Sequence, residues 1–269
     1  MGAPDRYEKD IVDKLWAYER ESKGELRQLA TVEVDGRQLP FVAFTTGGEV
    51  VVTARHHIYE SWGPTETVMR LAGSGQEGLT FVPVVDILNY AKAESRITYI
   101  LNYKGGSWAS ALIYDLYRGY KEGPPSNAEN DWPDYQYTGS NSPPHIAAIK
   151  RLISSCTLFI DLNNWAGSNF FSFTVPTAAR QETAIFDLMT RELQRGSRGT
   201  TDEVVQEFRD IKGQTALDYA ASLGRINLGL EMPVFNDLPN RSGWPQLRDV
   251  QDLVDITAGT ISSLARCIA

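Results

Sequence analysis

The chain has 269 residues, of which 42% are hydrophobic and 22% charged, and this is enough to bury the core of one larger α/β domain. A net charge of -8 and a pI near 5.0 argue against nucleic acid or an anionic membrane as the partner, because both select clustered Lys and Arg. Two cysteines are too few for a disulfide framework, and no apolar run approaches the length of a membrane span.

The amino-terminal residues and the cysteines bear on the compartment. Residues 1–10 lack the apolar core of a signal peptide. Cys156 lies beside the apolar run 158–160, where a buried free thiol is the ordinary outcome. We therefore expect a single domain spanning residues 1–269, in the cytoplasm.

Hydrophobic periodicity predicts the elements in chain order. Residues 8–23 carry apolar side chains at helical spacing and end at Gly24, which predicts a first amphipathic helix. Further helices are predicted over residues 65–71, 145–154, 177–195, 201–212, 216–223 and 246–267. Strands are predicted over residues 29–34, 40–45, 49–53, 80–85, 98–103, 157–162 and 226–231. Several of these strands are apolar on both faces, which is typical of a sheet covered on each side by helices.

A long segment, residues 120–144, is rich in Gly, Pro, Ser, Asn and Asp but also contains Trp132, Tyr135 and Tyr137. Composition alone indicates a linker. Aromatic residues are unusual in spacers, however, and long ordered loops are often functional. The segment is therefore either a linker or one wall of a pocket.

An imidazole and a carboxylate follow the apolar run 50–54 with the spacing His57-x-x-Glu60. A buried strand that ends in a nitrogen and an oxygen ligand can begin a zinc site. The same spacing also occurs by chance in solvated loops, so this motif alone leaves both interpretations open.

Six segments in a fixed order resemble the M14 zinc carboxypeptidase family. They are the Gly-Arg turn within residues 32–40, the His57-x-x-Glu60 motif, the strand at 82–90, Asp115-Leu116-Tyr117-Arg118, Asp161-Leu162-Asn163 after an apolar strand, and the turn at 213–219 followed by a strand ending in Glu231. No single segment is specific, but their shared order over most of the chain argues against chance.

The resemblance implies a three-layer α/β/α fold with a mixed, largely parallel central sheet. It implies a metal site formed by His57, Glu60 and Asn163, although Asn163 stands where the family has a third histidine. The implied cofactor is zinc, held more weakly than by the family's ligand set, or another divalent metal. Glu231 takes the place of the catalytic base.

The same resemblance makes Arg118 the residue that holds a substrate carboxylate, with Tyr117 in the place of an asparagine. The residues themselves fit these roles. The planar guanidinium of Arg118 can donate two parallel hydrogen bonds to a carboxylate, and a surface arginine is the alternative. A carboxylate at the end of an apolar strand, such as Glu231, suits a general base, and a salt-bridged glutamate is the alternative.

Other polar residues are expected to be structural. His145 begins a predicted helix and is expected at the surface, and His56 should face away from His57 in an extended strand. Asp161 and Asp218 are expected to support a site or to cap a helix.

The functional prediction is a metal-dependent hydrolase of the carboxypeptidase type. Glu231 assists the attack of metal-bound water on an amide bond next to a carboxylate, in a peptide or a small carboxylate-bearing amide. The alternative is a non-catalytic carboxypeptidase-like binding protein that has lost the metal site through Asn163. An enzyme with other chemistry in the same cleft is a third possibility.

Overall fold

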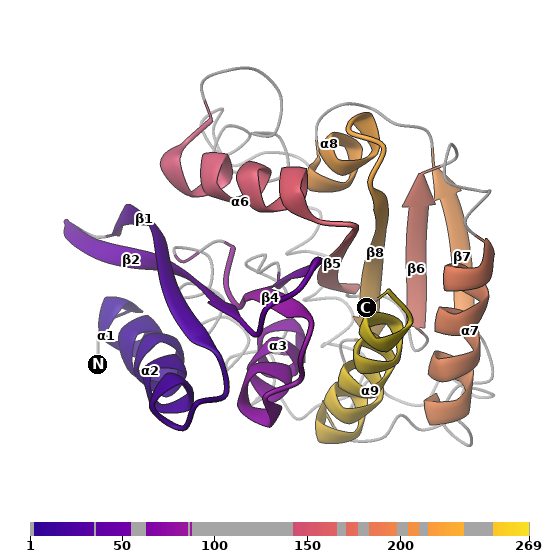
Figure 1. Ribbon diagram of the computed structural model, residues 1–269, viewed down its shortest axis with the longest axis horizontal. Coiled ribbons are helices and arrows are strands. Elements are labelled where there is room, and N and C mark those ends of the chain that lie inside the picture. Colours follow the sequence, from indigo (N-terminus) through magenta and orange to yellow (C-terminus); the bar gives the residue numbers. More distant parts are fainter. Residues whose placement is uncertain are drawn as a thin grey trace, which may run out of the picture.

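The computed structural model describes residues 3–34, 36–54, 63–85, 87, 142–165, 171–176, 183–197, 204–209, 215–233 and 250–268. Within them, eight strands form one mixed sheet in the order β1-β2-β4-β3-β5-β8-β6-β7 (Figure 1). The strands are β1 Glu25–Val34, β2 Arg37–Thr45, β3 Val50–Ala54, β4 Leu79–Val82, β5 Leu158–Trp165, β6 Phe171–Pro176, β7 Val204–Arg209 and β8 Ile226–Pro233.

Helices lie on both sides of the sheet. They are α1 Ala3–Tyr7, the π-helix η1 Glu8–Val12, α2 Asp13–Arg20, α3 Gly63–Ser74, α6 Pro144–Ser155, α7 Thr183–Ser197, α8 Ala216–Ser222 and α9 Val250–Ile268. Helices α2, α3, α9 and α7 contact one another in a row, whereas α6 and α8 form a separate pair (Figure 1). This is the three-layer α/β/α architecture that the sequence predicts.

The centre of the sheet is parallel. Strand β3 pairs in parallel with β4 on one side and with β5 on the other, and β5 pairs in parallel with β8. All five residues of β3 and all four of β4 are buried. Strands buried on both faces are typical of parallel sheets between helical layers. The carboxyl ends of β3, β5 and β8 therefore meet at one edge of the sheet.

The amino-terminal helix packs against the β1–β2 hairpin at the side of the sheet. Its buried residues Tyr7, Ile11 and Leu15 recur every four positions, wider than the 3.6-residue repeat of an α-helix. The π-helical turn η1 lies between α1 and α2 and widens the local repeat, which keeps these side chains on one face. The Tyr7 hydroxyl donates a hydrogen bond of 2.9 Å to the backbone oxygen of Pro40.

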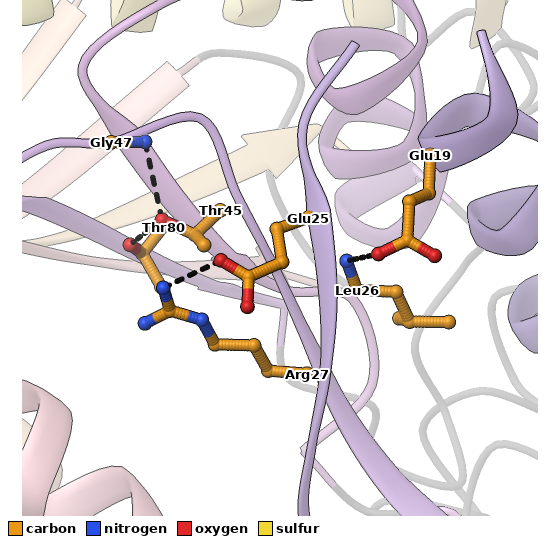
Figure 2. A network of polar contacts seen from close by, with 7 residues as sticks. All are labelled: Glu19, Glu25, Leu26, Arg27, Thr45, Gly47 and Thr80. Carbon is orange, nitrogen blue, oxygen red and sulfur yellow. Dashed lines mark hydrogen bonds and ion pairs between the residues drawn. The ribbon is translucent and has the colours of Figure 1, made fainter. Parts of the chain in front are cut away.

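Figure 2 shows the polar contacts that join β1 and β2 to their neighbours. Thr45 of β2 lies opposite Thr80 of β4, and their buried hydroxyl oxygens are 3.0 Å apart. The backbone N–H of Gly47 also donates to the Thr45 hydroxyl, at 3.2 Å. The Thr45–Thr80 contact therefore joins β2 to β4, where the antiparallel part of the sheet meets the parallel part.

Two strands at the other side differ from the sequence prediction. Residues 201–212 were expected to be helical, but β7 occupies Val204–Arg209, and β6 was not predicted. The apolar residues Val204, Val205 and Phe208 fit helical and extended periods about equally over so short a segment. The parallel pairing of β7 with β6 decides for the extended form. The predicted strand 98–103 lies outside the described residues.

His145 was expected at the surface, but it is half-buried. Its ring packs edge-on against Phe41, with centroids 5.7 Å apart and planes inclined by 60°. Burial lowers the pKa of the His145 imidazole to about 4. Burial has the opposite effect on a thiol and raises the pKa of Cys156 to about 11, and Cys156 is a free cysteine as expected.

Across the described ranges, no helix combines the length and the apolar character needed to cross a bilayer.

A first prediction concerns the turns before β3 and β4. A Cβ atom at Gly48 would lie 1.9 Å from the carbonyl carbon of Gly78, so the two backbones meet only because residue 48 is glycine. We expect Gly48→Ala to lower the free energy of unfolding by about 3 kcal/mol or more in a denaturant titration. Gly259 in α9 is exposed with open space around its Cβ position, so Gly259→Ala should raise it by roughly 0.5–1 kcal/mol. Equal effects of the two changes would contradict the packing argument.

A second prediction follows from His145. Between about pH 6.5 and pH 4 the unfolded chain binds a proton at this imidazole and the folded chain does not, so stability falls as the pH falls through this window. We expect the wild type to lose about 1–3 kcal/mol more unfolding free energy over this window than His145→Phe. Urea titrations of both proteins at pH 7 and pH 4 measure the difference, because the carboxylates contribute equally to both. Parallel pH profiles would show that the ring titrates normally.

Candidate functional site

Polar side chains gather on one face of the sheet, where β3, β5 and β8 end. One face of the sheet is covered by α3. Met232 of β8 points to that face, since its sulfur accepts a hydrogen bond of 3.6 Å from the Thr67 hydroxyl of α3. Because side chains alternate along a strand, Glu231 and the residues level with it lie on the other face. Asn163 pairs directly with Glu231 in the parallel register of β5 and β8. The two side chains are therefore neighbours on adjacent strands.

Asp161 lies two residues before Asn163 and so shares its face of β5. Its carboxylate is 2% exposed and accepts a hydrogen bond of 2.7 Å from the hydroxyl of Thr53, the residue opposite it in β3. Thr53 is 1% exposed. A buried carboxylate is stable only with such donors. This bond links β3 to β5 near their carboxyl ends, two residues before Asn163.

Asn163 is 5% exposed, and within the described part of the chain its buried side-chain oxygen Oδ1 has no hydrogen-bond partner. Few buried polar atoms in folded proteins lack a partner, and those that do call for an explanation. Glu231, beside it, is half-buried. An unpaired amide oxygen beside a carboxylate can accept a donor group or bind a cation.

The remaining predicted site residues fall outside the described part of the chain. The last described residue of strand β3 is Ala54, which pairs with Leu162, one position before Asn163. His57 and Glu60 follow in residues 55–62, which the structure does not describe. Tyr117 and Arg118 lie in the undescribed segment 88–141.

The described residues offer few ligands to a metal ion. Within the described ranges, no three His, Cys, Asp or Glu residues lie close enough to hold one. Asn163 is not among these residue types, and its unpartnered oxygen, next to Glu231, fits a divalent cation. The described residues thus supply one candidate oxygen ligand and a neighbouring carboxylate, fewer than the ligands that hold a metal ion in a protein site.

Asp218 has a local role. It forms a capping box at the start of α8, in which Thr215 accepts from the Asp218 backbone N–H and the Asp218 carboxylate accepts from the Thr215 backbone N–H at 3.0 Å. Such boxes satisfy backbone donors at a helix start. Asp218 therefore acts as a helix cap, one of the two roles expected of it.

No protein-family model and no curated protein sequence matches the chain. Among solved structures, carboxypeptidase A from Helicoverpa armigera superposes with a TM-score of 0.61 and 12% identity, over 97% of this chain and 72% of that one. A metallo-carboxypeptidase from Burkholderia cenocepacia gives 0.60 and 15%, over 97% and 70%. A metallo-carboxypeptidase from Pseudomonas aeruginosa, in complex with (2-guanidinoethylmercapto)succinic acid, gives 0.56 and 14%, over 96% and 68%.

The chain has the M14 carboxypeptidase fold. The resemblance read from six sequence segments is confirmed at the level of the fold, since the superposition extends over nearly the whole chain. At 10–15% identity, the likeness carries the architecture alone.

One contact at this edge of the sheet was not predicted from the sequence. Thr53 was assigned to a strand, but its hydrogen bond with Asp161 was not foreseen. The available signal was weak: a hydroxyl and a carboxylate each interrupt an otherwise apolar run. Only the register of β3 with β5 shows that these interruptions lie opposite each other.

A third prediction tests this bond. Thr53→Val keeps the shape of the side chain but removes the donor to a buried carboxylate, so it should lower the free energy of unfolding by about 1–3 kcal/mol. The matched control is Thr257→Val in α9, a residue buried as deeply, whose hydroxyl donates to the backbone oxygen of Leu253 at 2.8 Å. The control should change stability by less than about 1 kcal/mol, since a helical carbonyl keeps its backbone bond. Equal losses in both variants would remove the special role of the Thr53–Asp161 pair.

Proposed function

We propose that this chain is a metal-dependent hydrolase of the carboxypeptidase type, which cleaves an amide bond next to a carboxylate. The observation that carries the proposal is the direct pairing of Asn163 with Glu231 at the carboxyl edge of a carboxypeptidase-like sheet. Ligand sites of open α/β sheets lie outside the carboxyl ends of the strands.

Asn163 is the proposed third ligand of a divalent metal, zinc or a related ion, together with His57 and Glu60 from the segment after β3. Its buried, unpartnered oxygen supports this role. A metal held there supplies Lewis acidity, which polarises the substrate carbonyl and makes water easier to deprotonate.

Glu231 is the proposed general base. It takes a proton from the attacking water as the oxygen bonds to the amide carbon, and the same proton then reaches the leaving amine as the C–N bond breaks. Its half-buried position at the end of β8, beside Asn163, supports this role. A base held at one place by a strand is already oriented when the substrate binds.

Arg118 is the proposed anchor for the substrate carboxylate, with Tyr117 beside it. A guanidinium can form two parallel hydrogen bonds with a carboxylate, which sets the distance between that group and the scissile amide. The substrate class that follows is a peptide or a small amide with a free carboxylate next to the cleaved bond.

A fourth prediction tests the base. Glu231→Gln preserves size and shape, so we expect it to keep the melting temperature and any bound metal while lowering turnover by about 10² to 10⁴. The assay uses N-acyl dipeptides with a free terminal carboxylate, and their carboxamides should react far more slowly. The matched control is Glu25→Gln, which removes an exposed carboxylate paired with Arg27 and should leave the rate unchanged.

Two other outcomes would contradict the proposed role of Glu231 or the proposed activity. If Glu231→Gln lowers the melting temperature and leaves hydrolysis intact, Glu231 is a structural ion-pair residue. If the wild type binds dipeptides but hydrolyses none with any divalent metal added, the chain is the non-catalytic binding protein instead. A non-catalytic binding protein is the second candidate function, because Asn163 stands where the family has a histidine ligand.

A further inference from the structure

Strand β1 is the end strand of the sheet, so its outer edge has no neighbouring strand among the described residues. Its inner edge pairs with β2 from Glu25 to Val34. The outer edge lies at the surface, since the side chains of Glu25 and Arg27 are 58% and 56% exposed. An exposed edge presents backbone N–H and C=O groups with which a strand of another chain can pair.

The backbone groups on the outer edge belong to particular residues. In an antiparallel pair, residues that bond to the opposite strand alternate with residues whose N–H and C=O groups point away. The N–H of Leu26 donates to a side chain outside the β1–β2 ladder, so Leu26 points outward, and Gln28 follows by alternation. Thr31 lies opposite Pro40, which has no N–H and whose oxygen accepts from the amino-terminal helix. Thr31 therefore points outward too, and Glu33 follows by alternation.

A bulge divides this edge and selects the strand that can match it. Leu29 is skipped in the pairing with β2, where the register shifts between Gln28 and Ala30. The outward residues Gln28 and Thr31 are therefore one position further apart than those of a regular strand. A second copy of this chain, running antiparallel, has the same wide interval. It therefore matches this edge better than a regular strand does.

The wide intervals define how two copies would pair. When they lie opposite each other about a two-fold axis, Gln28 of one copy faces Thr31 of the other, and Leu26 faces Glu33. The Leu26–Glu33 pairs form both ends of this ladder, because the axis repeats each contact. They require the N–H of Leu26 as a donor.

In the folded chain this N–H is already in use. Glu19, near the end of α2, accepts it through Oε1 at 3.0 Å (Figure 2). Glu19 is half-buried, so the bond is partly shielded from water. The carbonyl oxygen of a second copy cannot occupy the place that the Glu19 carboxylate holds.

We propose that Glu19 prevents this protein from dimerising through β1. The Glu19 carboxylate of each copy closes one end of the two-fold ladder and leaves only the pairs beside the bulges. Short and bulged edges pair weakly. The inference is independent of the proposed function, since it concerns the first strand of the sheet and not the carboxyl ends of β5 and β8.

The experiment is sedimentation equilibrium of the purified, full-length chain from roughly 10 μM to roughly 1 mM. Glu19→Ala removes the acceptor and frees the N–H of Leu26. The dimer dissociation constant should fall at least about ten-fold below that of the wild type, because the strand-to-strand bond forms at both ends of the ladder. Circular dichroism and the melting temperature confirm that the variant is folded.

Two control variants separate the hydrogen bond from the charge. Glu19→Gln keeps an acceptor oxygen at the same place and loses only the charge. Glu21→Ala removes a nearby carboxylate that pairs with Lys23. Both controls should associate no more strongly than the wild type.

Hydrogen exchange locates the contact. In the Glu19→Ala dimer, the backbone amides of Thr31 and Glu33 should exchange at least about ten-fold more slowly than in its monomer, because pairing protects them from water.

Four outcomes overturn the inference. The first is a Glu19→Ala variant that stays monomeric over the whole concentration range. The second is equal association of either control, since loss of charge would then be sufficient. The third is association without protection of Thr31 and Glu33, which would place the contact elsewhere. The fourth is a wild type that already dimerises with these amides protected, because Glu19 would then close nothing.

Discussion

The parallel register of β3, β5 and β8 is the constraint on which the rest of the molecule depends. It pairs Thr53 with Asp161 and Asn163 with Glu231, although these strands are far apart along the chain. A slip of one residue would turn every side chain of a strand to the opposite face. The parallel ladder of five residue pairs between β3 and β5, continued by eight pairs between β5 and β8, defines this register. The polar edge is thus held in place by the pairing of these strands.

The polar side chains at that edge lower the stability of the sheet. Nearly all of the surrounding core is aliphatic or aromatic, yet Asp161 and Asn163 are 2% and 5% exposed on its central strand. Burying them is unfavourable unless each finds a partner. Thr53 is such a partner for Asp161, whereas the residues that the structure describes offer none to the Asn163 oxygen. Positions where local preference and global fold disagree are often functional, since selection for activity can maintain them. The cation that we propose would remove the conflict.

The fold is shared with solved carboxypeptidases although few residues are identical. Solved carboxypeptidases superpose over 97% of this chain at 12–15% identity. Cores accept many combinations of apolar residues when volume and pattern are kept, so a fold can persist although most individual residues differ. The supporting devices here are local ones: a π-turn that aligns the first helix with its hairpin, a capping box at Thr215, and a glycine contact between Gly48 and Gly78.

The sequence by itself determined the elements with a strong period and clear ends. The central strands around residues 50–53, 158–162 and 226–231 were predicted, as were helices α6, α8 and α9, because apolar periodicity and capping residues are local properties. The order of the six motifs also predicted the fold. The motifs singled out Asn163 and Glu231 but did not show that the two residues lie side by side.

Tertiary structure alone decided the rest: the pairing of β7 with β6, the burial of His145 against Phe41, and the registers that join Thr53 to Asp161 and Asn163 to Glu231. Each depends on contacts between distant segments, and hydrophobic pattern along one strand carries no information about which residue of another strand lies opposite.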